Sequence, residues 1–432
     1  MKRIDWSSLD GAARVAALER PRQRTDLALL VRVREIVDDV RARGWAALCD
    51  HARILDGDEP RLVAVTEAAA AARRDFESEQ LAAIELACET ITRFHQASRP
   101  TDIEVETMPG VRVSKAWRPI DRVGLYVPGG RSPLFSTLLM LAIPARTAGV
   151  GALVVATPPR LDGGLDPAIA LAADHCGIEA IWTMGGAQAI AALAFGAGAI
   201  APIAKLCGPG NAWVAAAKVY AASLSGGPAI DMPAGPSELM IIADESADPR
   251  LVAADLLSQA EHDEAAQVIL VTRDTRLSDR VAEAVFAQLS SLPRAGTAQA
   301  AIGHARTIIV ADLEQAIAVA NAYAPEHLSL AVADPEAMVP RIRNAGAVFA
   351  GHAVAESFGD YLAGSSHVLP TDGAARAWSG ISTQSFMKAM TVQRLSPHAV
   401  KALAGPAAAL ARLEGLEAHA RAAEIRREGV DA

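Results

Sequence analysis

Glu326 and His327 stand side by side in the segment 323–328, at a point where a helix is expected to end. A carboxylate beside an imidazole is a ready acid/base pair. Histidine has the side-chain pKa nearest neutrality, and a carboxylate can hold the ring or activate a water. A helix-to-strand turn with two solvated polar residues is the alternative interpretation of the pair alone. Other polar segments of the chain decide between the two.

The segment 258–263 closes a helix that is expected to begin near residue 248. Gln259 and His262 are three residues apart, so they lie on one helical face and could converge on a metal ion. Histidine is a usual zinc ligand, whereas a glutamine oxygen is an unusual one. Spacing alone would nominate Asp255 or Glu261 as readily, so the segment indicates a metal site without defining it.

The segment 359–370 carries Asp360 and His367 in a loop rich in Gly and Ser that ends at a proline. Loops of this composition often present functional groups on a rigid scaffold. The alternative is turn chemistry, with Asp360 bonded to nearby backbone amides. The segment is therefore a second candidate source of ligands.

Glycine placement indicates a phosphate or nucleotide loop. Gly185-Gly186-Ala187-Gln188 follows one expected strand, and Gly208-Pro209-Gly210-Asn211 follows the next; each precedes a helix. Backbone amides at helix starts favour phosphates. Neither segment is the Gly-x-Gly-x-x-Gly fingerprint of dinucleotide-binding folds. The loop 231–238, with Ser237 as a possible ligand contact, is a further constrained turn.

Composition excludes several classes of function. The 432 residues suggest about two to four domains. No apolar run approaches the roughly 20 residues that cross a bilayer, so no membrane partner is expected. With 41 Lys plus Arg against 50 Asp plus Glu, the net charge is −9 and a nucleic-acid partner is not expected either. The start of the chain lacks the apolar core of a secretory signal, which predicts a cytoplasmic protein. The four cysteines have no Cys-x-x-Cys spacing and are interpreted as reduced thiols.

The elements that must position these residues follow from hydrophobic periodicity. Residues 1–122 are rich in Ala, Arg, Glu and Leu, with helical periodicity over 26–43 and 67–96. We expect a largely helical N-terminal segment that packs on the 238–378 domain. Residues 379–432 lose the β-branched runs and predict a helical C-terminal arm. That arm is too small to bury a core alone, so it must dock on its own chain or on a second copy.

Between these segments the chain predicts an α/β fold with two doubly wound, Rossmann-like parallel-sheet domains, residues 123–237 and 238–378. Short β-branched runs alternate there with Ala-rich helical segments, which is the pattern of parallel βαβ units. A β-prone run over 122–127 that stops at a Pro-Gly-Gly turn begins the first domain. The later runs are 153–157, 180–184, 203–207, 239–243, 268–272 and 307–310.

Seven blocks of the sequence closely resemble the L-histidinol dehydrogenase family, in the family's order and over nearly the whole chain. The blocks are 123–130, 185–189, 208–212, 231–237, 256–262, 325–328 and 359–371. The resemblance implies an enzyme that oxidises L-histidinol through the aldehyde to L-histidine, the last steps of histidine biosynthesis. It also implies one Zn²⁺ per active site, two NAD and one water per substrate, and a homodimer whose active sites are shared between chains.

Site residues are implied position by position. The catalytic pair of the family matches Glu326 and His327. Its zinc ligands match Gln259, His262, Asp360 and His419. Its substrate contacts match Ser237, Gln259, His262, His327, Asp360, Glu414 and His419. Its NAD contacts match Tyr126, Gln188 and Asn211, and 123–237 would be the NAD-binding domain.

Physical roles follow from this implied set. Zinc would act chiefly as a template that fixes the carbinol carbon against the nicotinamide. His327 would take the alcohol proton, and Glu326 would activate the water that hydrates the aldehyde. Glu414 and His419, in the tail, would serve the partner's site.

Two departures from the family's pattern concern the shape of one loop. Ser366 stands where the family commonly has Asn, and Ala353-Val354-Ala355-Glu356 replaces an aromatic-Ser/Thr-Pro-Glu segment. A paralogous zinc- and NAD-dependent dehydrogenase of another small polar alcohol is therefore the alternative function. Manganese or cobalt would also suit the implied ligands. A zinc hydrolase would need a compact His-x-x-x-His helix, which the sequence lacks.

Overall fold

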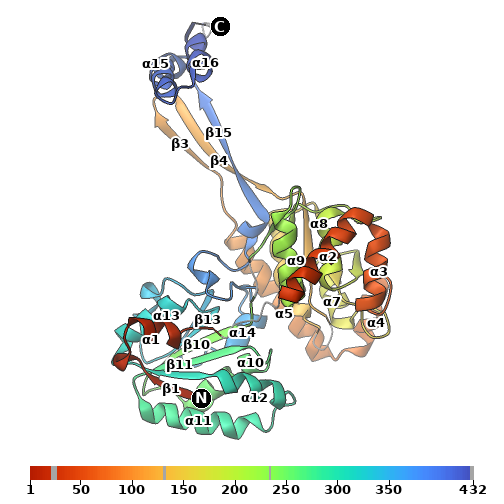
Figure 1. Ribbon diagram of the computed structural model, residues 1–432, viewed down its shortest axis with the longest axis vertical. Coiled ribbons are helices and arrows are strands. Elements are labelled where there is room, and N and C mark those ends of the chain that lie inside the picture. The colour runs from red at the N-terminus through yellow and green to blue at the C-terminus, as the bar shows by residue number, and fades with distance from the viewer. Residues whose placement is uncertain (21–26, 130–132, 233–234, 429–432) are drawn as a thin grey trace. The chain divides into compact units, whose positions relative to one another are not determined.

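The computed structural model describes residues 1–20, 27–129, 133–232 and 235–428. Gly130 of the Pro-Gly-Gly turn, and Pro233 and Ala234 of the loop 231–238, lie outside the described residues. The chain divides into two compact units (Figure 1). The first comprises residues 1–98 and 120–386, and the second comprises residues 99–119 and 387–432.

The first sheet has strand order β2-β7-β6-β5-β8-β9. All neighbours are parallel except β2, which is antiparallel to β7. Its strands are β2 (Arg61–Ala64), β5 (Arg122–Tyr126), β6 (Ala152–Thr157), β7 (Ala180–Thr183), β8 (Lys205–Cys207) and β9 (Ala229–Ile230). Because β6 and β8 flank β5, the order reverses between β5 and β8. That point is the topological switch of a doubly wound sheet.

Helices cover both faces of the first sheet (Figure 1). They are α2 (Leu27–Arg43), α3 (Trp45–Leu55), α4 (Val65–Asp75), α5 (Ser78–Ala97), α6 (Phe135–Ala148), α7 (Pro167–His175), α8 (Gly186–Phe195) and α9 (Ala212–Ser223). Within this set α2 packs on α8 and α9, α4 on α7, and α5 on α6. The structure thus differs from the expectation that residues 1–122 pack as one body on the second domain. Apolar faces of α2 to α5 are buried against the first domain instead.

The second sheet is fully parallel, with order β1-β12-β11-β10-β13-β14. Its strands are β1 (Lys2–Asp5), β10 (Glu238–Ala243), β11 (Gln267–Thr272), β12 (Arg306–Ile309), β13 (His327–Ala331) and β14 (Ala347–Ala350). Every residue of β10, β11 and β13 is buried, as expected for strands of a parallel sheet that is covered on both faces. Among the described residues of the N-terminal region, β1 joins this sheet, and Trp6 and Ala17 pack against one of its faces.

Alternate residues of β10 enter two different cores. Leu239 and Ile241 pack with α10 (Pro249–Ala260), α11 (Thr275–Leu289) and α12 (Ala295–His304). Met240 and Ile242 pack on the other face, with α13 (Leu313–Tyr323) and with Ala17 at the end of α1 (Gly11–Ala17). Successive side chains of a strand point to opposite faces. Glu238 therefore shares the α13 face with Met240.

The second unit is a three-stranded antiparallel sheet that carries two helices. Its strands are β3 (Ile103–Met108), β4 (Val111–Pro119) and β15 (Met387–Leu395), in the order β15-β4-β3. Helices α15 (Pro397–Leu413) and α16 (Glu417–Glu428) pack on each other. The expected helical arm thus has a β-ribbon at its base, built partly from residues 99–119. All side chains of β3 are exposed, so the strand is held by its backbone pairing with β4 rather than by burial in a core.

Short helices complete the fold. They are α14 (Glu356–Tyr361) and the 3₁₀ helices η1 (Trp6–Ser8), η2 (Val339–Arg341), η3 (Ala374–Arg376) and η4 (Thr383–Phe386). The two parallel sheets confirm the predicted fold class of two doubly wound domains. In the described part of the chain, no helix is long and apolar enough to cross a membrane.

Candidate active site

The Glu326-His327 pair lies at the amino-terminal edge of the second sheet. Asp312 caps the start of α13 by accepting a hydrogen bond from the backbone of Gln315. The helix ends at Ala324, which has φ 56° and ψ 67°. This left-handed conformation costs a non-glycine residue about 1–2 kcal/mol. Pro325 follows, and β13 begins at His327. A constrained turn thus delivers both side chains to one place.

Glu238, the first residue of β10, joins the pair through its backbone. Its N–H donates to Oε2 of Glu326 at 2.8 Å, and its carbonyl oxygen lies 3.3 Å from Nδ1 of His327. The parallel register sets Leu239 opposite His327, which is why these groups meet. Glu326 and His327 are both almost fully buried.

The contacts of His327 distinguish its two ring nitrogens. Nδ1 faces the Glu238 carbonyl and lies 3.3 Å from Oε1 of Glu356 and 3.6 Å from Oε2 of Glu326. Nε2 lies 3.6 Å from Oδ1 of Asp360, beyond hydrogen-bond length, and has no hydrogen-bond partner among the described residues. Acceptors around Nδ1 favour the tautomer with its proton there. In the neutral ring, Nε2 is then the nitrogen that can accept a proton.

Helices α10 and α14 bring further polar groups to the same place. Asp248 caps α10 and Pro249 occupies its first turn, and Gln259 lies in its last turn. The amide of Gln259 satisfies its neighbours when its nitrogen donates to Oε1 of Glu356 at 2.5 Å and its oxygen accepts from the Glu238 N–H at 2.7 Å. Glu356 and Asp360 are four residues apart on α14, so they share one helical face.

Buried carboxylates dominate the electrostatics. Burial alone lowers the pKa of His327, but the Glu356 and Glu326 carboxylates outweigh it and hold that pKa well above its ordinary value. Burial raises the pKa of Glu356 to about 8. Burial also acts to raise the pKa of Asp360, yet the net shift is downward because of His327, His367 and His262. Three carboxylates around one imidazole make a site suited to a bound cation.

The donor set fits a divalent metal ion. Ligand atoms of His327, Glu356 and Asp360 all lie within 4.8 Å of one another. The buried atoms Nε2 of His327 and Oε2 of Glu356 lack partners within the described parts of the chain. Imidazole nitrogens and carboxylate oxygens are zinc ligands. This cluster shares only Asp360 with the ligands implied by the resemblance, although Gln259 contacts Glu356 and His262 is close enough to affect Asp360.

The expected NAD contacts gather at the switch point of the first sheet. Tyr126 ends β5, and its hydroxyl accepts from the Gly186 N–H at 3.2 Å. Gln188 donates to Asp56 at 3.0 Å, and its buried Oε1 has no partner within the described residues. Asn211 caps α9 by accepting from the backbone of residues 213 and 214. Ligands of doubly wound sheets bind at this edge.

A buried ion pair fixes the loop after β8. Lys218 contacts Asp231 and donates to the Gly208 carbonyl at 2.7 Å, while the Gly208 N–H donates to Asp231 at 2.7 Å. Gly208 has φ 127°, and a Cβ there would lie 2.0 Å from the Tyr126 carbonyl oxygen. The loop approaches β5 so closely that only glycine fits.

A pocket of about 80 Å³ is lined by this loop and by Glu326. Ser237 and His367 also line it. His367 is held by the Asp360 carbonyl at 2.8 Å from Nδ1 and by the Thr137 hydroxyl at 3.2 Å from Nε2. The pocket is therefore lined both by the loop after β8 and by Glu326 of the candidate acid/base pair.

The predicted site residues thus fall into three groups. The structure brings His327 close to Glu326 and Asp360, and Gln259 joins them through Glu356 and the Glu238 N–H. His262 and Ser237 lie nearby. It gathers Tyr126, Gln188 and Asn211 at the edge of the first sheet. Glu414 ends α15 and His419 lies in α16, both in the second unit, so their place in the site stays a prediction.

Sequence reasoning missed Glu356 as a member of the site. Its spacing of four residues from Asp360 was the available signal. The cysteines match their predicted inert role: all four are free, and burial raises the pKa of each, to about 11 for Cys88. Protonated thiols are poor nucleophiles.

Two doubly wound domains with a buried acid/base pair beside the switch-point loop suit an oxidoreductase. A family model for histidinol dehydrogenase matches residues 18–427. Histidinol dehydrogenase of Xanthomonas euvesicatoria pv. vesicatoria (strain 85-10) is 48% identical over 427 residues, which cover 99% of each chain. That of Rhizobium meliloti (strain 1021) is 49% identical over 398 residues, 91% of each chain. The crystal structure of histidinol dehydrogenase from Elizabethkingia anophelis has a TM-score of 0.95 at 38% identity, covering 100% of this chain and 99% of that one. The chain belongs to the histidinol dehydrogenase family.

Proposed function

We propose that this enzyme oxidises L-histidinol to L-histidine through the aldehyde, with two NAD and one water, as the final steps of histidine biosynthesis. The observation that carries the proposal is Nε2 of buried His327, which has no hydrogen-bond partner in the described structure and lies 3.6 Å from Oδ1 of the candidate metal ligand Asp360. A substrate held at that ligand would present its hydroxyl to the free nitrogen. Glu326 and His327 are the proposed catalytic residues.

Gln259, His262, Asp360 and His419 are the proposed zinc ligands; His327 and Glu356 are not among them, because Nε2 of His327 must stay free to accept a proton. Tyr126, Gln188 and Asn211 are the proposed NAD contacts. Ser237 and Glu414 are proposed to contact the substrate, together with His327 and the zinc ligands. When bound, zinc would supply a Lewis acid and a template, and NAD would supply the hydride acceptor.

In the first oxidation, His327 would take the hydroxyl proton at Nε2 while hydride leaves the carbinol carbon. The ring is ready for this because Nδ1 is held by the Glu238 carbonyl and by Glu356. The contacts at Nδ1 fix the ring plane, so Nε2 keeps one direction. Moving the proton to a buried base also excludes exchange with bulk water.

In the second oxidation, Glu326 would take a proton from the water that adds to the aldehyde. Its carboxylate faces the pocket of about 80 Å³, and a water occupies about 30 Å³ in the liquid, so there is room for one. The hydrate then loses hydride from carbon to a second NAD and a proton from oxygen, which yields the carboxylic acid; the acid ionises to the carboxylate in water. His327 is the base positioned for that proton.

Incubation with NAD and L-histidinol tests the proposal. Purified protein loaded with zinc should form two NADH per histidinol and release L-histidine, measured by absorbance and chromatography. His327→Asn should abolish turnover, whereas His352→Asn, a histidine bonded to Ser246 outside the site, should retain it. Faster turnover of another small amino alcohol, or no NADH, would contradict the assignment and favour a paralogous dehydrogenase.

Sharing of the active site in a homodimer is a separate proposal. Its support is the predicted role of Glu414 and His419 in a second unit that has no doubly wound core of its own. Coexpression of a His327→Asn chain with a His419→Asn chain tests it. If the tail serves the partner's site, each mixed dimer combines both defects in one site and leaves the other intact, so activity returns. If the tail serves its own chain, no mixed site is intact and activity stays absent. Cytoplasmic residence stays a prediction.

A further inference from the structure

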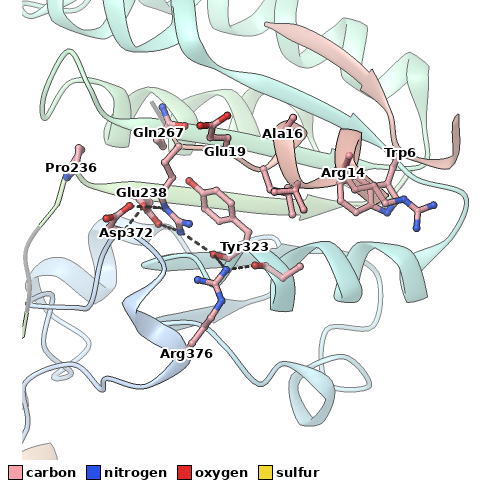
Figure 2. Close-up of a pocket in the computed structure, with 15 residues that line it drawn as sticks. Trp6, Arg14, Ala16, Glu19, Pro236, Glu238, Gln267, Tyr323, Asp372 and Arg376 are labelled. Atoms are coloured by element: carbon pink, nitrogen blue, oxygen red, sulfur yellow. Dashed lines mark hydrogen bonds and ion pairs between the residues drawn. The ribbon is translucent and has the colours of Figure 1, made fainter. Parts of the chain in front are cut away.

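A pocket of about 910 Å³ lies on the α13 face of the second sheet (Figure 2). His327 pairs with Leu239, whose side chain packs on the opposite face of that sheet. Residues of the N-terminal segment, including Trp6 and Arg20, form one wall. Glu238 and Tyr323 form another, and both belong to the elements that lead to the catalytic pair.

Arg20, which lines this pocket, forms a buried ion pair with Glu238. Its Nε contacts Oε1 of Glu238, and its Nη2 donates to Oε2 at 2.8 Å. The Glu238 side chain is 1% exposed and that of Arg20 is 16% exposed. A two-point contact between guanidinium and carboxylate fixes direction as well as distance. The backbone N–H of Asp372 also donates a hydrogen bond to Oε1 of Glu238, at 3.0 Å.

Arg20 also holds the turn before Glu326. Its Nη2 donates to the Tyr323 carbonyl at 3.0 Å and to the Ala324 carbonyl at 3.3 Å. The guanidinium lies 3.9 Å from the centre of the Tyr323 ring. Ala324 is the residue in the left-handed conformation. Such a conformation persists only where the surroundings enforce it.

The residues that Arg20 contacts, Glu238 and the turn at Tyr323 and Ala324, are connected to the proposed catalytic pair through the backbone. The peptide groups of Glu238 bond Glu326 and approach His327, and Ala324 is two residues before Glu326. A small displacement of either backbone would move the carboxylate or the imidazole. Misplacement of reacting groups by about 1 Å can cost on the order of 100-fold in rate.

We propose that Arg20 is a positioning residue for the oxidation. By holding the Glu238 carboxylate and the Tyr323 and Ala324 carbonyls on one face of the sheet, it fixes the backbone that orients Glu326 and His327. The inference rests on the proposed function, because it assigns those two residues the proton transfers. It gives the N-terminal segment a part in the reaction.

The test compares Arg20→Met with Arg306→Met. Arg306 is the matched control because it donates to the Ala17 carbonyl at 2.7 Å and also bonds the Glu19 carbonyl. It therefore holds the same segment without touching Glu238. Arg20→Met should lower kcat about 10- to 100-fold with KM for L-histidinol changed less than about threefold. Arg306→Met should keep kcat within about twofold, and zinc content should be unchanged in both.

Arg20→Lys keeps the charge but loses the two-point fork, so it should recover only part of kcat. It replaces Arg20→Met if that variant fails to fold. Wild-type kcat in a folded Arg20 variant would overturn the proposal. An equal loss in Arg306→Met would also overturn it, since loosening of the whole segment would then explain both.

Hydrogen exchange separates this inference from the proposed function. Amides of residues 324–330 should exchange faster in Arg20→Met than in Arg306→Met, whatever the substrate is. If wild-type protein forms no NADH from L-histidinol, the proposed function fails, and the exchange result still decides whether Arg20 holds the turn. Equal exchange in the two variants refutes that role.

Discussion

Replacement of Glu326 by Gln should separate the two oxidations. Oε2 of Glu326 accepts from the Glu238 N–H at 2.8 Å, and an amide oxygen can take that place, so the turn should keep its geometry. The variant loses the carboxylate that faces the pocket of about 80 Å³. General-base catalysis contributes about 10²- to 10⁴-fold, which corresponds to a barrier increase of about 2.7–5.4 kcal/mol. Only the hydration step should bear that increase.

The assay is a single turnover with enzyme in excess over L-histidinol. Wild-type enzyme should form two NADH per substrate, whereas Glu326→Gln should form the first at a near-normal rate and the second about 10²- to 10⁴-fold more slowly. The aldehyde should be captured by a carbonyl reagent in the interval. Formation of both NADH at wild-type rates would refute the reasoning. Equal slowing of both would show that Glu326 acts on the alcohol step as well, through its contact with His327.

Three further predictions concern the site and its supports. His327→Asn should lower turnover by orders of magnitude while zinc, measured by elemental analysis after dialysis, stays bound; near-normal turnover would remove its role as base. Lys218→Met should destabilise the fold by about 3–5 kcal/mol in urea unfolding, because Asp231 would remain buried without its partner, whereas loss of the exposed Arg250 should change the midpoint little. Burial lowers the pKa of His95 from 6.5 to about 4, so the unfolded state binds more protons between these values and stability falls as pH drops through that window. His95→Leu should flatten that pH dependence of the thermal midpoint; an unchanged slope would exclude His95 as its source.

The long β-branched runs were predictable because both faces of their strands are buried. Residues 239–243 and 268–272 were expected as strands, and β10 and β11 contain them with one more residue each. Other strands, among them β1 and β3, were not predicted. β1 depends on pairing with β12, some 300 residues away, and no local pattern reveals that partner. β3 does alternate apolar and polar residues, a signal that the helical composition around it obscured.

Within the site, the family resemblance implied which residues meet but not how they are held. Composition and spacing mark the segments of Glu326, His327, Gln259 and Asp360, but only the resemblance singles out these four. Their contacts run through the backbone of Glu238, whose position follows from the parallel register of β10 and β13. Side-chain motifs carry no information about such a backbone contact. Glu356 was missed for the same reason, because its place in the site depends on its contacts with Gln259 and His327, which come from other elements.

The edge of the second sheet that carries the site is the amino-terminal one, whereas doubly wound domains bind ligands at the carboxyl ends of their strands. Asp244 explains the difference at the switch point between β10 and β13. Its carboxylate follows β10 and accepts from the Ser246 N–H at 3.0 Å and from the Ala333 N–H at 2.9 Å. A ligand there would have to displace bonds that already satisfy the loop ends after both strands. At the opposite edge, Nε2 of His327 and Oε2 of Glu356 are buried without partners in the described structure. Unsatisfied polar atoms are costly unless a ligand completes them, so the amino edge is where the second domain can do chemistry.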